Sequence, residues 1–277
     1  MLIEPRLSPA CTWTMRYLTI TNSVDLYYED AGEGPPVVLI HSWGTSARMW
    51  NAQLADLTTD HRVISYDWRG CGRSSHPAGG NTIAQNAADL IELCAALQLH
   101  SPVLVGHSVG AIFATEAALA EPAAVGGVLA IDGPGYWGTQ VAHRLTGIRT
   151  ALAADRAKVI TAWVPGWYGP AADEALHAWT IRQILDSGPY IDELFDEQAA
   201  YDPRPSLAKP HVPIRYLHGS LDTQVPLEVS RQLASIAPAE DDLVILDNAG
   251  HMPHQEQPAR VSNAIRAFTA SVRQPVR

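Results

Sequence analysis

The chain has 277 residues, of which 47% are hydrophobic and 17% charged, and its formal net charge is −10. This composition is normal for one large globular α/β unit, and the acidic excess disfavours nucleic acid and anionic membranes as partners. The cysteines, Cys11, Cys71 and Cys94, form neither a disulfide framework nor a metal-ligand spacing. No run approaches the roughly 20 apolar residues of a membrane span. We therefore expect a cytoplasmic protein that acts on a small molecule.

Strands and helices alternate through the first part of the chain, after an extension at residues 1–14 that lacks the apolar core of a signal peptide. Apolar and β-branched runs predict strands, whereas apolar residues at helical spacing predict helices. The predicted strands are Arg16–Thr21, Val24–Asp30, Val37–Ile40 and Arg62–Tyr66, and the predicted helices are Arg48–Leu57 and Thr82–Leu97. The wholly apolar run at 37–40 is typical of a strand buried on both faces.

The most informative stretch begins with another β-branched run, Val103–Val105. It stops at Gly106-His107-Ser108-Val109-Gly110, and the Ala-rich segment Ala111–Ala120 follows directly. This order predicts a strand, a sharp turn and a helix, and the turn matches the pattern Gly-x-Ser-x-Gly. Such a turn lifts the serine hydroxyl above the sheet, while the helix directs its free N–H groups towards the same place. The simpler alternative is a serine that only caps the helix.

A predicted strand at Val125–Ile131 ends at Asp132, and the pattern then changes. Residues 135–210 contain helical segments near Val141–Ala154 and Ala172–Asp186 but no clear strand, and they hold four of the eight tryptophans. We interpret this segment as a helical lid inserted into a core formed by residues 15–134 and 211–277. The alternation resumes with strands at Ile214–His218 and Leu243–Leu246 and helices at Glu228–Ile236 and Pro258–Val272.

The alternation predicts a doubly wound, mostly parallel sheet with helices on both faces. Ligands of such sheets bind beyond the carboxyl ends of the strands. Ser108, Asp132, Asp222 and His251 all follow predicted strands. We therefore expect these side chains to meet at one edge of the sheet.

These motifs resemble those of the α/β-hydrolase fold superfamily, and the resemblance extends from about Arg16 to Val272. It implies that Ser108 is the nucleophile and that His251, after the last strand, is its base. A carboxylate should orient the imidazole. Asp222 occupies the usual position in the order Ser, Asp, His, and Asp132 is the alternative acid because some members use that earlier position.

The resemblance also implies an oxyanion hole built from the backbone N–H groups of Val109 and Trp43. The sequence His41-Ser42-Trp43 departs from the usual His-Gly, since Ser42 replaces the glycine. We expect aromatic residues of the lid to form a largely apolar pocket, although some of them pack only within the lid. The candidate pocket residues are His41, His107, Tyr136, Trp137, Trp163 and Trp167. We interpret His107 and His254 as structural neighbours of the site, and we predict neither a metal nor a cofactor.

The implied activity is hydrolysis of an ester, thioester or lactone through an acyl-enzyme. The chain also has some likeness to cofactor-free dioxygenases of this fold that open 3-hydroxy-4-quinolone rings, on the strength of Asp132, Trp43, Trp68-Arg69-Gly70 and Ala162-Trp163. In those enzymes a His–Asp pair deprotonates the substrate. Cofactor-free perhydrolases, which use the same serine triad, and non-catalytic ligand binders are further alternatives. The sequence leaves the substrate and the oligomeric state open.

Overall fold

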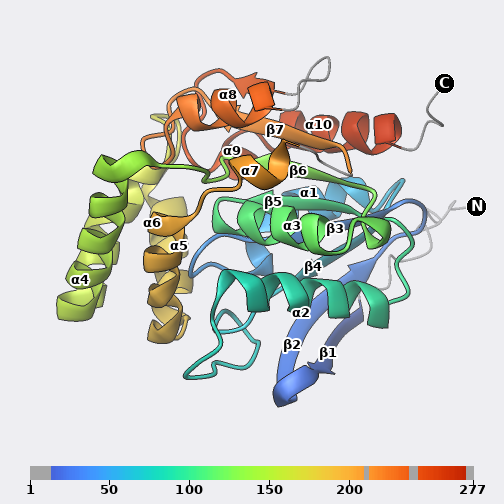
Figure 1. Cartoon of the computed structure of the whole chain (residues 1–277), viewed down its shortest axis with the longest axis horizontal. Coiled ribbons are helices and arrows are strands. Elements are labelled where there is room, and N and C mark those ends of the chain that lie inside the picture. The colour runs from blue at the N-terminus through green and yellow to red at the C-terminus, as the bar shows by residue number, and fades with distance from the viewer. Residues whose placement is uncertain (1–13, 209–211, 237–242, 273–277) are drawn as a thin grey trace, which may run out of the picture.

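The computed structural model describes residues 14–208, 212–236 and 243–272, and it confirms the predicted α/β architecture (Figure 1). Within these ranges the strands form one eight-stranded sheet in the order β1-β2-β4-β3-β5-β6-β7-β8. The first two strands pair antiparallel with their neighbours, and the remaining pairs are parallel. The strands are β1 Thr14–Ile20, β2 Val24–Ala31, β3 Pro36–Ile40, β4 Arg62–Tyr66, β5 Val103–His107, β6 Gly127–Ile131, β7 Ile214–Gly219 and β8 Leu243–Leu246.

The parallel register brings the carboxyl ends of the central strands to one edge. Ile40 pairs with Gly106, His107 with Ile131, and Gly219 with Leu246. Strands β5 and β6 are buried along their whole length, as expected for strands covered on both faces. The loops that follow β3, β5, β6, β7 and β8 therefore emerge close together.

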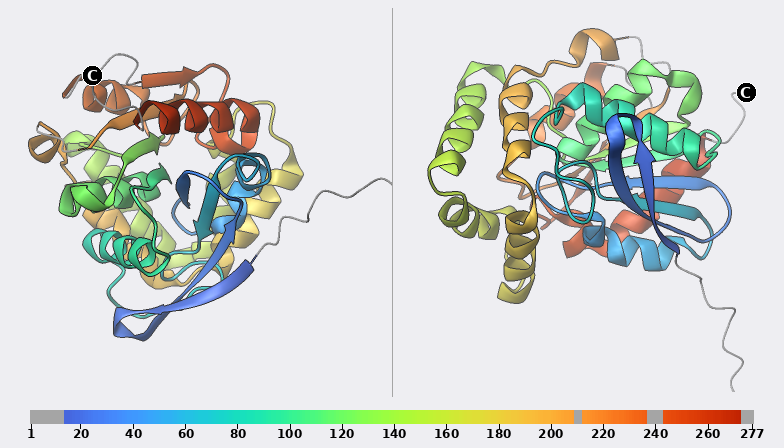
Figure 2. Two further views of the ribbon diagram at one scale, coloured as in Figure 1. Left: turned by 90° about the vertical axis from the view of Figure 1, so that its right-hand side faces the viewer. Right: turned by 90° about the horizontal axis from the view of Figure 1, so that it is seen from below.

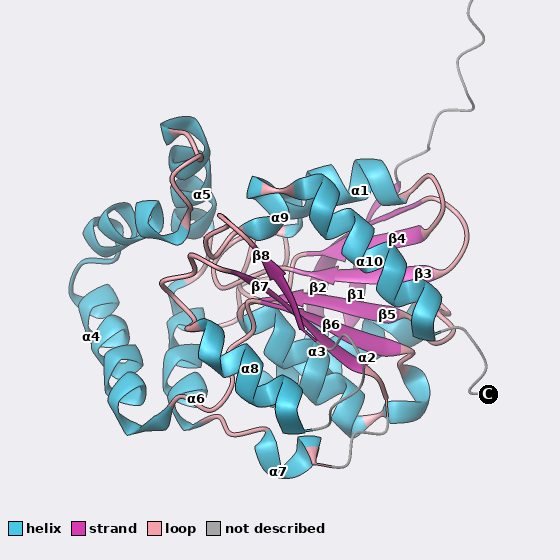
Figure 3. Ribbon diagram, turned by 90° about the horizontal axis from the view of Figure 1, so that it is seen from above, coloured by secondary structure: helices cyan, strands magenta, loops and turns pink. Residues whose placement is uncertain are grey.

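Helices cover both faces of the sheet (Figure 3). The contacts between α1 and α10 and those between α2 and α3 define the two helical layers, while α8 packs on β7. None of the described helices is long and apolar enough to cross a bilayer. The helices around the sheet are α1 Asn51–Leu57, α2 Ile83–Ala96, α3 Val109–Ala120, α8 Leu227–Ile236, α9 Pro253–Glu256 and α10 Pro258–Val272.

The segment between β6 and β7 is helical, and it stands beyond the carboxyl edge of the sheet (Figures 1 and 2). Its helices are α4 Gly138–Trp163, α5 Glu174–Asp186, α6 Leu194–Ala200 and α7 Arg204–Leu207. Helix α4 contacts both α5 and α6. Helices α4, α5 and α6 thus form a small helical layer beyond the strand ends, whereas α7 packs against α8.

Several details differ from the predicted elements. Helix α4 is longer than the predicted Val141–Ala154 and is interrupted at Asp155 (φ −157°, ψ 85°), whose carboxylate accepts the N–H of Lys158 and so caps a second helical stretch. A 3₁₀ turn at Ala47–Trp50 replaces the start of the helix predicted from Arg48. The short helices α6, α7 and α9 were not predicted. The proposed extension at 1–14 lies outside the described residues except for Thr14, which begins β1.

Candidate active site

Ser108 occupies the turn between β5 and α3 in a strained backbone conformation. Its φ is +54° and its ψ is −125°, a region that residues with a side chain rarely adopt. Its N–H donates to the carbonyl oxygen of Ile131 at 2.9 Å. A Cβ atom on Gly110 would lie 2.6 Å from the carbonyl oxygens of Ile40 and His41, so only glycine lets α3 start this close to β3. These contacts present the Ser108 hydroxyl at the carboxyl edge, as the sequence pattern predicts.

His251, in the loop between β8 and α9, joins this hydroxyl to a carboxylate. Its Nε2 lies 3.1 Å from Oγ of Ser108, and its Nδ1 lies 2.7 Å from Oδ2 of Asp222. A carboxylate accepts hydrogen bonds, so the Nδ1 proton donates to Asp222 and the lone pair of Nε2 faces the serine. This arrangement allows the imidazole to take a proton from the hydroxyl.

Asp222 is held as an anion by several donors. Its Oδ1 accepts the N–H groups of Gln224 at 2.6 Å and Val225 at 3.1 Å, and its Oδ2 accepts from His251. Burial raises the pKa of Asp222, but the charge and hydrogen bond of His251 and the backbone donors outweigh burial, and the net pKa lies below the usual value. The serine, imidazole and carboxylate, which are far apart in sequence, therefore form one continuous hydrogen-bonded chain.

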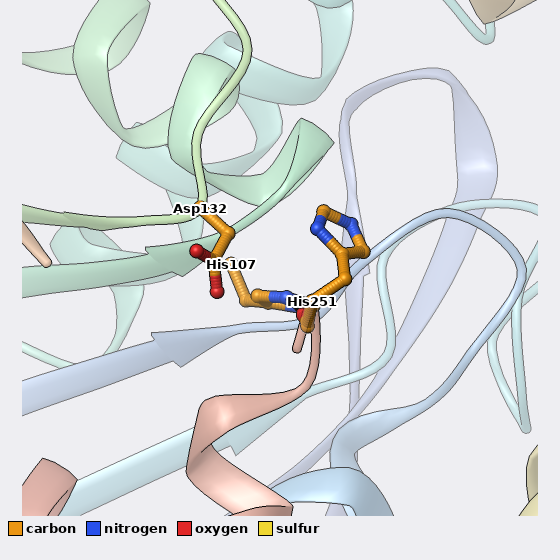
Figure 4. Close-up of side chains that lie close together, drawn as sticks. All are labelled: His107, Asp132 and His251. Atoms are coloured by element: carbon orange, nitrogen blue, oxygen red, sulfur yellow. Dashed lines mark hydrogen bonds between the residues drawn. The ribbon is translucent and has the colours of Figure 1, made fainter. Parts of the chain in front are cut away.

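Asp132, the alternative acid, makes different contacts. Its Oδ1 accepts the N–H of Gly219 at 2.8 Å, whereas no hydrogen bond reaches its Oδ2. Asp132, His107 and His251 gather at the strand ends (Figure 4). The imidazole of His251 nonetheless makes its carboxylate hydrogen bond with Asp222. The geometry therefore favours Asp222 as the carboxylate that is hydrogen-bonded to His251 in the series Ser108–His251–Asp222.

The backbone of His251 is fixed from two directions. Its N–H donates to the carbonyl oxygen of Trp167 in the inserted segment at 2.6 Å, and its own carbonyl oxygen lies 2.6 Å from Nε2 of His107. The carboxylate of Glu256 accepts the N–H groups of Gly169 and Gly250 at 2.8 and 2.9 Å. The inserted segment thus helps to place the loop that carries the imidazole.

The loop after β3 carries Trp43, and His41 at its start braces the loop from below. His41 donates through Nδ1 to the carbonyl oxygen of Ser42 at 2.8 Å and accepts at Nε2 the N–H of Trp68 at 3.2 Å. Burial lowers the pKa of His41 to about 3, so its imidazole is neutral. The loop accommodates Ser42 at the position where the resemblance led us to expect glycine, and the hydroxyl of Ser42 lies 3.2 Å from that of Thr45.

A cavity opens over Ser108 and His251 at the carboxyl edge of the sheet. Four tryptophans predicted near the site line it: Trp43, Trp137, Trp163 and Trp167. The other lining residues are Ser42, Pro134, Arg144, Leu145, Ile148, Phe195, Gln198, Gln224 and Val225. Apart from His251 and Arg144, no residue of this lining is ionisable, so the cavity is largely apolar.

Three candidate pocket residues lie elsewhere. His41 and His107 are completely buried beneath the cavity, where their ring nitrogens contact the backbone of the two active-site loops. Tyr136 is 38% exposed and lies under the guanidinium of Arg204. These three residues were predicted because they lie next to site residues in the sequence. Their side chains nevertheless lie outside the lining of the cavity.

Sequence reasoning missed several residues of the lining. Arg144, Leu145 and Ile148 lie on one face of α4, and their spacing was the only signal available. Phe195 and Gln198 share a face of α6 in the same way. Their distance from every sequence motif explains why they were not recognised.

Two clusters have the residue types of a metal site, but in each of them one imidazole has both ring nitrogens hydrogen-bonded. Asp132, His218 and Asp222 each offer an atom within 4.8 Å of the others, as do His107, Asp132 and His251. Both ring nitrogens of His218 are hydrogen-bonded, to Ser230 and Val225, and those of His251 to Ser108 and Asp222. In each cluster one imidazole therefore has no free nitrogen for a metal ion, while Oδ2 of Asp132 and Nδ1 of His107 have no hydrogen-bond partner among the described residues.

Comparison with known proteins shows which family the chain is similar to. The family model described as "Alpha/beta hydrolase family" matches residues 37–264. The chain is 26% identical to the AB hydrolase superfamily protein YisY of Bacillus subtilis over 92% of this chain and 99% of that protein. It is 30% identical to a non-heme chloroperoxidase of Streptomyces lividans over 76% of this chain and 84% of that protein.

A solved structure agrees with the sequence relatives. The thermophilic esterase from Thermogutta terrifontis superimposes with a TM-score of 0.84 at 26% identity, and the match covers 94% of this chain and all of that one. The family match spans most of the chain, including the strand that carries Ser108 and the loop that carries His251. The protein is thus an enzyme of hydrolase type, and it belongs to the alpha/beta hydrolase family.

Proposed function

We propose that the protein hydrolyses an ester, thioester or lactone of a largely apolar small molecule through an acyl-enzyme. The observation that carries this proposal is the continuous chain Ser108–His251–Asp222, which opens into an aromatic cavity. A serine hydroxyl is a weak nucleophile at neutral pH unless a base accepts its proton. Here the base lies within hydrogen-bonding distance, and its second nitrogen is held by a carboxylate.

The reaction then proceeds in two halves. Oγ of Ser108 attacks the substrate carbonyl carbon while Nε2 of His251 accepts the hydroxyl proton, and the C–O or C–S bond to the leaving group breaks as that proton is returned to it. Water, deprotonated by the same Nε2, attacks the acyl-enzyme and releases the acid and free Ser108. Asp222 stabilises the charged imidazole in both halves without accepting its proton.

The negative oxygen of the tetrahedral intermediates requires N–H donors. We assign them to the backbone of Val109, at the first position of α3, and of Trp43, in the loop after β3. The close approach of Gly110 to the carbonyls of Ile40 and His41 supports this pairing, because it holds the two segments against each other. We assign residues 135–210 the role of a lid, since this segment supplies Trp137, Trp163 and Trp167 to the wall.

Perhydrolysis is a second candidate, favoured by the 30% identity to a non-heme chloroperoxidase. Hydrogen peroxide would then replace water as the attacking group on the same acyl-enzyme. The dioxygenase alternative relied on Asp132 as the partner of the imidazole. The hydrogen bond between His251 and Asp222 weighs against it, so we rank it below both serine mechanisms.

The test compares Ser108→Ala with His251→Ala on a series of p-nitrophenyl esters and aryl lactones. We expect each variant to lose about 10⁴-fold or more in kcat, because each removes a member of a unit that acts together. A phosphonate ester should label wild type at Ser108 and leave Ser108→Ala unlabelled. Retention of most activity in Ser108→Ala together with its loss in His251→Ala would instead support the dioxygenase, with a 3-hydroxy-4-quinolone as the diagnostic substrate.

A further inference from the structure

Asp132 has an environment that the hydrolytic mechanism does not explain. It is completely buried at the end of β6, and its φ of +46° is strained for a residue with a side chain. Its backbone N–H donates to the carbonyl oxygen of Leu217, and its Oδ1 accepts the N–H of Gly219. Both contacts lock the carboxyl group against β7. Its second oxygen, Oδ2, is buried and has no hydrogen-bond partner within residues 14–208, 212–236 and 243–272.

The carboxyl group of Asp132 lies beside that of Asp222. Each carboxyl offers an oxygen within 4.8 Å of the other, and the two groups are close enough for a side-chain hydrogen bond if one of them holds a proton. The side chains of both are fully buried. Ionisation of both carboxyl groups in such a site is energetically unfavourable, because two negative charges would lie close together in a buried environment.

The surrounding groups decide which carboxyl keeps the proton. Asp222 is stabilised as an anion by two backbone N–H groups and by His251. Asp132 has the single donor Gly219. Burial, followed by the charge of Asp222, raises the pKa of Asp132 well above its usual value. These contacts favour the protonated form at Asp132 over Asp222, and Oδ2 of Asp132, which has no hydrogen-bond partner among the described residues, is the atom available to carry the proton.

Within the part of the chain that the structure describes, the basic side chain next to Asp132 is that of His218. His218, on β7, has its Nδ1 3.5 Å from Oδ1 of Asp132. Its ring nitrogens are also hydrogen-bonded, Nδ1 with the hydroxyl of Ser230 and Nε2 with the carbonyl oxygen of Val225. Burial lowers the pKa of both His218 and His107. Glu256, on α9, adds a further negative charge in the vicinity. His251 is already paired with Asp222.

We propose that Asp132 is a protonated positioning residue, whose Oδ2–H donates to the carboxylate of Asp222 and thereby limits the basicity of the His251–Asp222 pair. The inference rests on the proposed serine mechanism. An ionised Asp132 would place a second negative charge behind the imidazole and hold the proton taken from Ser108 too strongly. The neutral acid instead withdraws charge from Asp222, and the imidazole can return its proton to the leaving group.

The decisive kinetic test is the pH profile of kcat/KM for wild type, Asp132→Asn and Asp132→Ala. The acidic limb of this profile reports protonation of the base in the free enzyme. The Asn side chain keeps a donor at the Oδ2 position and the acceptor for Gly219, so its acidic limb should coincide with that of wild type. Asp132→Ala removes the donor, and its acidic limb should move to higher pH by about half a unit to one unit.

The opposite pattern would overturn the proposal. If Asp132 is ionised, Asp132→Asn removes a negative charge next to the pair, and its acidic limb should move to lower pH by about one unit or more. Identical limbs in all three proteins would show that Asp132 has only a structural role.

A measurement without substrate separates this inference from the proposed function. A carboxyl that keeps its proton in the folded protein loses it on unfolding at neutral pH, so wild-type stability must fall as pH rises between the unfolded and the folded pKa. The free energy of unfolding of wild type relative to Asp132→Asn, measured in urea, should therefore decline from just above the unfolded carboxyl pKa of about 4 towards neutral pH, with a limiting slope of one proton. If the free energies of unfolding of the two proteins change in parallel with pH, Asp132 is ionised in the folded protein. This conclusion would hold even if no ester proves to be a substrate.

Discussion

The carboxyl edge of the sheet and the inserted segment above it hold their side chains in different ways. At the sheet edge, Ser108, Asp222 and His251 are each fixed by hydrogen bonds of 2.6–3.1 Å to backbone or to one another. In the inserted segment, ring packing contributes to the cavity wall, and Trp163 also donates its indole N–H to Oε1 of Gln224 at 2.6 Å. Trp163 lies 6.0 Å from Trp43 and 5.2 Å from Trp167 between ring centroids.

This contrast assigns different tasks to the two regions. Hydrogen bonds have narrow distance and angle limits, so they define positions to the accuracy that proton transfer needs. Ring packing tolerates replacement by side chains of similar volume. Under the proposed mechanism the sheet edge would carry out the reaction and the inserted segment would select the substrate, so variants in the two regions should change different kinetic quantities.

The largest effect is expected from Asp222→Asn. The amide cannot stabilise the charged imidazole, and it favours the wrong tautomer of His251, so kcat/KM should fall by about 10³- to 10⁴-fold. The measurement is steady-state hydrolysis of whichever ester proves best for wild type. Asp247→Asn, in the loop after β8, is the control and should retain wild-type activity. A loss below about tenfold in Asp222→Asn would show that another acid orients the imidazole.

The second effect concerns stability and compares an ion pair from each region. Arg69 and Asp89 are only 3% and 2% exposed and are joined by two hydrogen bonds. Arg69→Leu leaves the Asp89 carboxylate buried without its partner, so it should lower the free energy of unfolding by about 3–5 kcal/mol. The pair Arg149–Asp196, which links α4 to α6, is 41% and 42% exposed. Arg149→Leu should cost no more than about 1 kcal/mol.

Urea unfolding of the two arginine variants, followed by circular dichroism, tests this difference. Equal losses in the free energy of unfolding would mean that the exposed ion pair of the inserted segment contributes as much to stability as the buried pair. That result would contradict the difference described between the two regions.

The same contrast explains how much the sequence alone could predict. Strands buried on both faces, such as β5 and β6, appear as short apolar runs. All eight strands were predicted, with ends shifted by a few residues. The glycines around Ser108 and the position of His251 after β8 identified two catalytic candidates. In the inserted segment, packing depends on contacts between distant residues, so the break in α4 at Asp155 and the helices α6 and α7 left no clear periodic signal.

The sequence alone also could not decide whether Asp132 or Asp222 contacts the imidazole of His251. Both follow strands that end at the same edge, so either carboxylate was placed to reach the imidazole. The outcome depends on backbone geometry: the φ of +46° at Asp132 directs its carboxyl group to the N–H of Gly219, while the turn after β7 brings Asp222 to Nδ1 of His251. No residue pattern encodes these directions.

The smallest expected effect is a change of selectivity in Trp137→Leu. Trp137 is half-buried and lines the cavity, whereas Trp179 is equally half-buried but lies outside the lining, under the guanidinium of Arg48. Removing indole surface from the wall should reduce the preference for a long-chain over an acetate ester by about fivefold to tenfold, since each buried methylene contributes about 0.8 kcal/mol.

Trp179→Leu is the matched control, and its ratio of kcat/KM values for the two esters should equal that of wild type. If Trp137→Leu changes kcat equally for both esters, Trp137 supports the catalytic geometry of the sheet edge and not the choice of substrate. If both variants shift the ratio alike, the selectivity reflects general loosening of the inserted segment. Only a shift confined to Trp137→Leu agrees with a wall whose individual rings select the acyl group.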